Sequence, residues 1–281
     1  VIVLSGLIVA ITNIIEFFNN AFRMWLFAVI EVTGNSSYDV SFRTHGLASS
    51  GGSSLSLGLL IIALIAYAMS RNHELGKWIR WFYGLSCIIL FCSNFVVGRT
   101  GLFLGLPIVI WLLFFSRGIS IRGAIKGILR ISLTVIAMAY IVSFIDEDSL
   151  NIIYKFGLEP VYNFVENGSL ESKTTNNVAD MYFFPDMLHF LFGAGFWRWP
   201  THGYSLPDPG YMKLLMSTGV FGSMLFYGYH SIVFKNAFSR LLSLLRDRRI
   251  LLYILVIFYI AEFKEAVFVQ NYSFKVMLLL L

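Results

Sequence analysis

Apolar residues fill long stretches of this chain, and short polar stretches separate them. The apolar stretches have about the length of a helix that crosses a bilayer, and none shows the period-two alternation of a membrane β-barrel strand. The pattern predicts an all-α, polytopic transmembrane bundle of about eight to ten spans. The predicted helices cover residues 1–15, 18–32, 50–70, 79–97, 101–116, 129–145, 210–234 and 249–263, with a last helix beginning near 272.

One long connection interrupts this pattern. Residues 146–209 are too many for a simple connector, and loops of this size are usually functional or disordered. The loop holds the aromatic cluster "MYFFPDMLHFLFGAGFWRWP", which predicts short helices on the membrane surface. We therefore divide the chain into N-terminal helices (1–145), an extracytoplasmic loop (146–209) and C-terminal helices (210–281).

Composition and charge agree with a membrane protein. Of the 281 residues, 57% are hydrophobic and 13% are charged. Twelve of the 21 basic residues lie in three alternate connections, which the positive-inside bias makes cytoplasmic. They are Arg71, Lys77, Arg80, Arg117, Arg122, Lys126, Arg130, Lys235, Arg240, Arg246, Arg248 and Arg249. This asymmetry explains the net charge of +5 without a nucleic-acid partner.

Neither the cysteines nor the chain ends point to a compartment. Cys87 and Cys92 fall inside one predicted span, where we expect small buried hydrophobic residues rather than a disulfide. The chain begins at Val1 without a methionine and stops at Leu281 inside an apolar run, so we expect it to be part of a longer protein.

The familiar metal and nucleotide motifs are missing from the sequence. It has no phosphate loop ending in Lys-Ser/Thr, no His-Glu-x-x-His and no Cys-x-x-Cys. Asp146-Glu147-Asp148 spells the Asp-x-Asp of soluble glycosyltransferases, but it follows a predicted helix with no α/β domain around it. We interpret it as an interfacial acidic cluster and predict no metal and no cofactor.

Two arginines on the predicted outer face are the first candidate site. Arg43 lies in "FRTHGL", and Arg99 with Thr100 lies in "GRTG" between two spans. For either arginine alone, a side chain that anchors the helix end at the lipid headgroups is the simpler interpretation. Together, each beside glycine and hydroxyl residues, they suit a pyrophosphate, because guanidinium groups bind phosphate oxygens in pairs and keep their charge.

A second candidate site opens the predicted helix at 210. Asp208-Pro209 is a helix start, with Asp208 as N-cap and Pro209 at the first helical position. Four polar residues lie at or near the start of this helix, where a general base and anion contacts would be useful: His202, Asp208, Tyr211 and Lys213. Capping and ligand contact are compatible roles for Asp208, whereas His202 has the simpler interpretation of a surface-loop histidine.

Small residues and charges mark two further features. Gly219, Gly222 and Ser223 predict a small-residue face for close helix packing. Lys264 and Glu265 follow Glu262 at a helix end, where the charges either neutralise one another or frame the same cavity.

The order of these motifs resembles that of the bacterial oligosaccharide repeat-unit polymerases, the O-antigen and capsular polysaccharide polymerases of the Wzy type. The motifs that carry the resemblance are "FRTHGL", "GRTGLFLGLP", "LFGAGF", "PDPGYMKLLMSTGVFGSMLFY" and "FKEAVF", between about residues 40 and 275. The related O-antigen ligases, in which a histidine is prominent, are the nearest alternative.

The resemblance implies a glycosyltransferase at the outer face of the bacterial cytoplasmic membrane, acting on undecaprenyl-pyrophosphate-linked oligosaccharides. It implies the lipid bilayer, a chain-length regulator and a flippase as partners. In this interpretation Arg43, Arg99 and Asp208 are catalytic, and Thr100, His202, Tyr211, Lys213, Lys264 and Glu265 bind substrate. Trp197 and Trp199 either stack on sugars or form an interfacial belt.

A lipid-linked oligosaccharide or organic-anion transporter is the alternative from another class. Transporters often contain inverted repeats and helices broken within the membrane. The sequence predicts neither feature, and its charged positions lie at one face, which favours an enzyme.

Overall fold

The computed structural model describes residues 1–30, 44, 46–48, 52–115, 155, 159–168, 173–195, 209–244 and 248–270. Every element in these ranges is a helix, as the apolar pattern predicts, and they contain no strand. The first five helices are α1 (Ile2–Phe18), α2 (Asn20–Val29), α3 (Ser53–Ser70), α4 (Lys77–Val97) and α5 (Arg99–Phe115). Those from the long loop are α8 (Glu159–Asn167), α9 (Lys173–Asp180) and α10 (Met187–Phe192). The last three are α11 (Gly210–Leu244), α12 (Arg248–Glu262) and α13 (Val267–Gln270).

The predicted helices agree with these bounds to within a few residues, with one exception. Helix α11 continues ten residues past the predicted end at 234, because a helix can extend beyond the apolar run into a charged segment. The predicted helices at 129–145 and near 272 lie outside the described residues. Two helices, α3 and α4, are both long and apolar enough to cross a membrane, so the larger number of spans stays a prediction.

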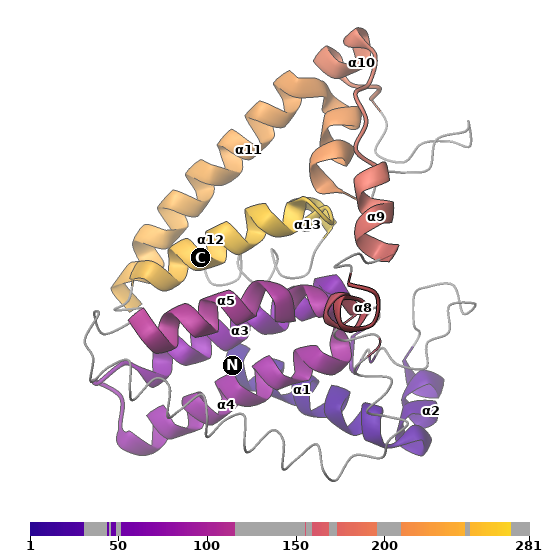
Figure 1. Ribbon diagram of the computed structural model, residues 1–281. Coiled ribbons are helices and arrows are strands. Elements are labelled where there is room, and N and C mark those ends of the chain that lie inside the picture. Colours follow the sequence, from indigo (N-terminus) through magenta and orange to yellow (C-terminus); the bar gives the residue numbers. More distant parts are fainter. Residues whose placement is uncertain are drawn as a thin grey trace.

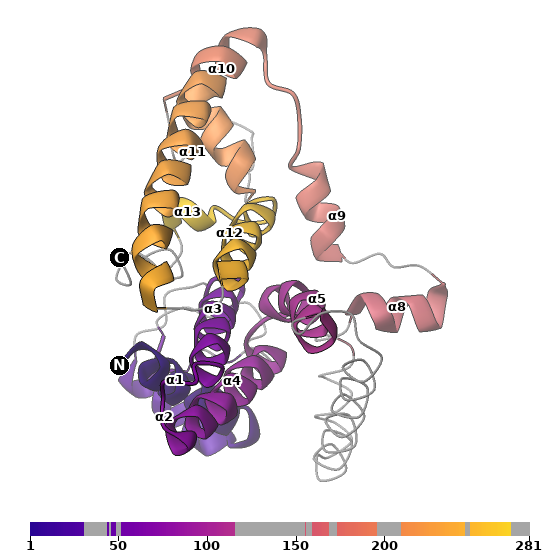
Figure 2. The same ribbon diagram turned by 90° about the vertical axis from the view of Figure 1, so that its left-hand side faces the viewer.

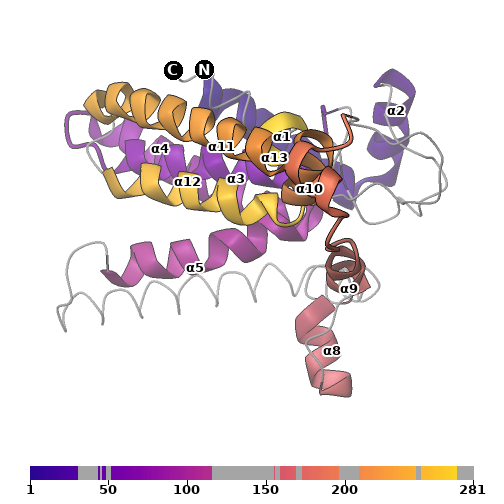
Figure 3. The same cartoon turned by 90° about the horizontal axis from the view of Figure 1, so that it is seen from above.

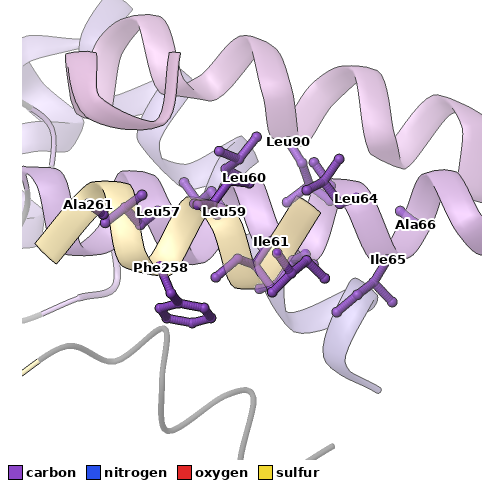
Figure 4. Close-up of a cluster of buried hydrophobic side chains, with 14 of the residues drawn as sticks. Leu57, Leu59, Leu60, Ile61, Leu64, Ile65, Ala66, Leu90, Phe258 and Ala261 are labelled. Carbon is purple, nitrogen blue, oxygen red and sulfur yellow. The ribbon is translucent and has the colours of Figure 1, made fainter. Parts of the chain in front are cut away.

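Helix α3 lies at the centre of the molecule. Its apolar side chains are buried on every side, as expected for a helix that is hydrophobic all round. Helices α1, α4, α5 and α12 all pack against it. Figure 4 shows Leu60 and Leu64 of α3 close to Leu90 of α4, with Phe258 of α12 in the same cluster.

Helices α3, α4, α5 and α12 run in roughly the same direction, which gives the bundle two distinct ends, whereas α11 rises away from α12 at an angle (Figures 1 and 3). We call the end that holds Ser53, Val97, Arg99 and Glu262 the junction end, because four helices begin or finish there. The opposite end holds the connection between α3 and α4, the end of α11 and the start of α12 (Figure 1). The short helices α8, α9 and α10 of the long loop lie toward the junction end (Figures 1 and 2).

Helix α11 is broken at Gly219, which the sequence analysis did not predict. Gly219 has φ 70° and ψ −178°, a conformation that residues with a Cβ rarely adopt. The helix turns back there, so that a short arm (210–218) and a long arm (220–244) meet beside α10 (Figures 1 and 2). Gly219 also packs closely, as predicted, because a Cβ there would lie 2.2 Å from the Leu191 carbonyl oxygen of α10; the break was the unpredicted part.

The loop before α11 satisfies the backbone groups that this break exposes. The carbonyl groups of Met216 and Ser217 accept hydrogen bonds from the amides of Ala194 (2.7 Å) and Gly195 (3.0 Å). A continuing helix would have supplied these donors from residues 220 and 221. The motif "LFGAGF" therefore has a defined structural role: it pairs with the broken turn of α11.

The cysteines of α4 are free, as expected. Both Cys87 and Cys92 are partly exposed rather than fully buried, and Cys87 packs against the buried apolar core.

Candidate functional site

The motifs "GRTG" and "FKEAVF" are in direct contact at the junction end. The Lys264 ammonium donates a hydrogen bond to the Thr100 hydroxyl, with Nζ 2.9 Å from Oγ1, although the two residues are 164 positions apart. The next residue, Glu265, accepts a hydrogen bond from the hydroxyl of Ser53 at the start of α3. Two residues predicted to bind substrate therefore join the starts of α3 and α5 to the end of α12.

A buried polar cluster fixes the start of α5. The Ser56 hydroxyl lies 2.6 Å from both Asn94 Oδ1 and the Gly98 carbonyl oxygen, and it accepts a hydrogen bond from the Gly101 amide (2.8 Å). Both Ser56 and Asn94 are fully buried. A Cβ on Gly101 would collide with Ser56 and Asn94, so the second glycine of "GRTG" allows α5 to approach α3 closely.

The chain after Arg43 is anchored beside the same turn. Thr44 is buried, and both its amide and its hydroxyl donate to the carbonyl of Val96, at 3.2 and 3.3 Å. The Gly46 amide donates to Glu16 Oε2 of α1 over 2.7 Å. Thr44 therefore lies next to the residues that lead into Arg99. Arg43 and the Arg99 side chain lie outside the described residues, so their pairing stays a prediction.

Glu16 is a buried carboxylate that the sequence analysis did not single out. It is 1% exposed, and its Oε1 lies 3.9 Å from Arg23 Nε of α2. The two residues lie on separate helices, so the turn at Asn19 brings them together and no helical spacing in the sequence indicated the pair.

Glu262 is a second buried carboxylate. The sequence analysis named it only as one of the charges at a helix end. It is 1% exposed at the end of α12. Its Oε1 accepts a hydrogen bond from the Tyr227 hydroxyl (3.0 Å), and its Oε2 accepts from the amides of Val267 (2.7 Å) and Phe268 (3.2 Å). Glu262 therefore joins the long arm of α11 to the turn between α12 and α13.

Tyr211 and Lys213 lie on the short arm of α11. The Tyr211 hydroxyl donates to the carbonyl of Tyr259 over 2.9 Å, and its ring packs on Phe263 and Tyr227. Tyr211 is thus engaged within the bundle, next to the residue that precedes Lys264. Lys213 is partly exposed on the same arm.

The remaining predicted site residues, Asp208 and His202, lie outside the described residues, as do Trp197 and Trp199. The predicted cap needs one correction. Helix α11 begins at Gly210, and the amide of Lys213 donates to the carbonyl of Pro209 (2.9 Å). Pro209 therefore occupies the N-cap position that was assigned to Asp208, one residue later along the chain.

In the long loop, Asp186 and His189 form a pair at the start of α10. Asp186 caps α10, accepting from the amides of Leu188 and His189, both at 3.1 Å, while its other oxygen pairs with the His189 ring. These hydrogen bonds from His189 hold the pKa of Asp186 below its usual value. Within the described ranges, no three His, Cys, Asp or Glu side chains gather as metal ligands would.

Comparisons with known proteins add no assignment. No protein-family description, curated protein or solved structure matches this chain.

Proposed function

We propose that the protein is a multi-pass membrane glycosyltransferase that polymerises oligosaccharide repeat units carried on undecaprenyl pyrophosphate, at the outer face of the bacterial cytoplasmic membrane. The observation that carries this proposal is the contact between Lys264 and Thr100, which joins two motifs of the resemblance at one end of the bundle. The anchoring of Thr44 to Val96 adds a third motif at the same end.

Inverted helix amphipathicity supports the membrane part of the proposal. The side of α1 that faces the protein holds small and polar residues, whereas its outward side is apolar. The buried residues are Val3, Gly6, Ala10, Asn13 and Glu16, and the exposed ones include Leu4, Ile8, Ile11, Ile15 and Phe18. Water would disfavour such a surface, whereas a bilayer favours it, and small residues are typical of helix contacts in membranes.

Other helices share this outward apolar surface. On α4, the exposed residues are Trp78, Trp81, Leu85 and Ile88; on α12, they are Leu252, Val256 and Ile260. Their helical spacing forms continuous stripes rather than scattered single residues. These stripes support more membrane spans than α3 and α4 alone.

The proposed reaction forms a bond between an acceptor hydroxyl oxygen and the anomeric carbon of the donor glycan. The bond from that carbon to the lipid pyrophosphate breaks, and the pyrophosphate leaves with the electron pair. Arg43, Arg99 and Lys264 are suited to stabilise its growing negative charge. Asp208 is our candidate for the base that accepts the hydroxyl proton. A lipid-linked donor brings its own leaving group, so this chemistry needs no nucleotide-binding fold.

One observation favours the transporter alternative. The break at Gly219 divides α11 into two arms, and broken helices are common in transporters. The backbone groups at the break are, however, paired with residues 194 and 195, which leaves the carbonyls of Met216 and Ser217 engaged rather than facing a transit path. We therefore keep the enzyme as the favoured function.

Deletion of the gene in its host tests the function. A polymerase predicts surface glycan that carries a single attached repeat unit and no ladder on a gel. A ligase predicts loss of all attached repeats with accumulation of lipid-linked polymer. A transporter predicts repeat units that stay on the cytoplasmic side, and an unchanged ladder would refute all three.

Substitution of Arg99 by Lys tests the site. Lys keeps the charge but loses the paired geometry of a guanidinium, so Arg99→Lys should reduce polymer formation by at least about tenfold. Arg43→Lys should do the same. Arg80→Lys, at the opposite end of the bundle, is the matched control and should leave the ladder unchanged. Full activity of both site variants would indicate that the two arginines only anchor helix ends at the lipid headgroups.

A further inference from the structure

We propose that Glu262 is a positioning residue: its buried carboxylate folds the turn at residues 263–266 so that the Lys264 ammonium is held at the start of α5, where it binds the donor pyrophosphate. This inference rests on the proposed function. It explains how Lys264, the third cation proposed to bind the pyrophosphate beside Arg43 and Arg99, is held in place. Glu262 itself does not touch the substrate.

The geometry of the turn is the first part of the argument. After Glu262 three backbone hydrogen bonds continue the last turn of the helix. The Phe263 amide donates to the Ile260 carbonyl (3.2 Å), and the amides of Lys264 and Glu265 both donate to the Ala261 carbonyl (2.9 and 3.0 Å). The chain then reverses, and the Glu262 carboxylate accepts the amides of Val267 and Phe268 at the start of α13. These two bonds close a ring around the turn, so its backbone cannot open without exposing a buried carboxylate.

The surroundings hold Glu262 itself in place. Tyr227 donates to Oε1 from the long arm of α11, and the Cα of Gly210 on the short arm packs so closely that a Cβ there would collide with the carboxylate. Phe268, 3% exposed, packs its ring among those of Tyr227, Tyr259 and other aromatic residues. The carboxylate therefore sits in a rigid pocket formed by α11, α12 and α13.

The fixed turn determines where the Lys264 side chain lies. A lysine side chain has a flexible four-carbon stem, so its ammonium is well placed only if its backbone is fixed. The turn places Lys264 Nζ 2.9 Å from Thr100 Oγ1 and places Glu265 against Ser53. The Thr100 contact holds the positive charge of Lys264 at the "GRTG" turn, where it suits an anionic ligand such as a pyrophosphate.

Binding of inorganic pyrophosphate to the purified full-length protein tests the inference without requiring turnover. The readout is the pyrophosphate dissociation constant, obtained from the concentration dependence of the thermal unfolding midpoint. We expect Lys264→Met to weaken binding by about tenfold or more, since it removes a charge-assisted hydrogen bond. Glu262→Ala should weaken binding to a similar extent. Glu262→Gln keeps an acceptor for the two amides and should stay within about threefold of the wild type.

The double variant separates positioning from general damage. If Glu262 acts through Lys264, then Glu262→Ala combined with Lys264→Met should bind no more weakly than Lys264→Met alone. Losses that add independently would overturn the proposal, as would wild-type binding by a folded Glu262→Ala variant. Glu74→Ala, an exposed carboxylate at the other end of the bundle, is the control and should have no effect.

A milder variant covers the case in which Glu262→Ala does not fold. Tyr227→Phe removes one hydrogen bond to Glu262 and retains the ring, so it should weaken pyrophosphate binding by about threefold when Lys264 is present and not at all in Lys264→Met. Equal effects in both backgrounds would overturn the inference. Failure of the proposed function would appear separately, as an unchanged glycan ladder after gene deletion.

Discussion

The two buried carboxylates, Glu16 and Glu262, both accept hydrogen bonds from backbone amides, but their other partners differ. Each is 1% exposed, and each accepts backbone amides from a segment that carries a predicted substrate-binding residue or adjoins one. Glu16 lies opposite the guanidinium of Arg23, whereas Glu262 accepts from a tyrosine hydroxyl and two amides.

The partners indicate which property of each carboxylate stabilises the structure. At Glu16 the negative charge compensates a nearly buried cation, so both charge and hydrogen bonding are needed. At Glu262 the donors are a tyrosine hydroxyl and two backbone amides, which are neutral, so a neutral acceptor of the same shape can replace the carboxylate. The following variants test this contrast.

The largest effect is expected for Glu16→Ala. It leaves the Arg23 guanidinium, whose side chain is 11% exposed, without its carboxylate, and it removes the acceptor of the Gly46 amide. Breaking such a pair costs about 3–5 kcal/mol of unfolding free energy. Thermal or chemical unfolding in detergent measures the loss. The additional substitution Arg23→Leu should recover part of it, and no recovery would contradict the pairing.

Removal of charge alone gives the sharpest contrast. Glu262→Gln keeps an acceptor for neutral donors and should cost less than about 1 kcal/mol, whereas Glu16→Gln should cost about 2–3 kcal/mol because Arg23 loses its counter-charge. The same unfolding assay applied to both variants decides the matter. Equal costs would show that the two carboxylates do not differ as described.

Close packing against Glu262 gives a smaller effect. A Cβ at Gly210 would meet the Glu262 carboxylate and lie 2.8 Å from the Ala266 Cα, so Gly210→Ala should destabilise by about 1–3 kcal/mol. Gly228→Ala lies in the same helix with no atom near the added methyl group, and should be neutral or slightly stabilising. Similar unfolding midpoints for the two variants would argue against a rigid carboxylate pocket.

The smallest effect belongs to Asp186, an exposed carboxylate that extends the comparison. Its pKa is lowered by hydrogen bonds from His189, so its contribution is present above the unfolded pKa of about 3.9 and is lost as pH falls through the folded pKa. The protection of the Leu188 and His189 amides against hydrogen exchange, taken relative to the intrinsic rate at each pH, should therefore fall in acid. Asp186→Asn retains a capping oxygen and should show less of this pH dependence. Protection factors at these two amides that do not change with pH in the wild type would refute the cap.

Helix positions were largely predictable from the sequence. The apolar run of α3 begins and ends within three residues of its prediction, because glycines precede it and polar residues follow it. The break between α1 and α2 was also predictable, since Asn19 caps α2 by accepting the Phe22 amide (3.0 Å). Such signals are local, so they can be seen in a short window of sequence.

The reversal of α11 was not predictable in the same way. "STGVFGS" suits a small-residue packing face as well as it suits a break. The conformation of Gly219 is decided by the carbonyls of Met216 and Ser217 finding donors at residues 194 and 195, in a loop that precedes the helix. A helix break of this kind depends on a partner that the local pattern does not contain.

From the sequence alone we could predict that this chain is helical and apolar, that its basic residues favour one set of connections, and that its distinctive polar motifs belong to the other. These properties depend on composition and on periods of a few residues. The contacts of Lys264 with Thr100 and of Thr44 with Val96 depend instead on how the helices pack. The same is true of the backbone amides that Glu16 and Glu262 accept. Each such contact joins residues whose proximity results from helix packing, because buried polar groups must find partners wherever the fold brings them.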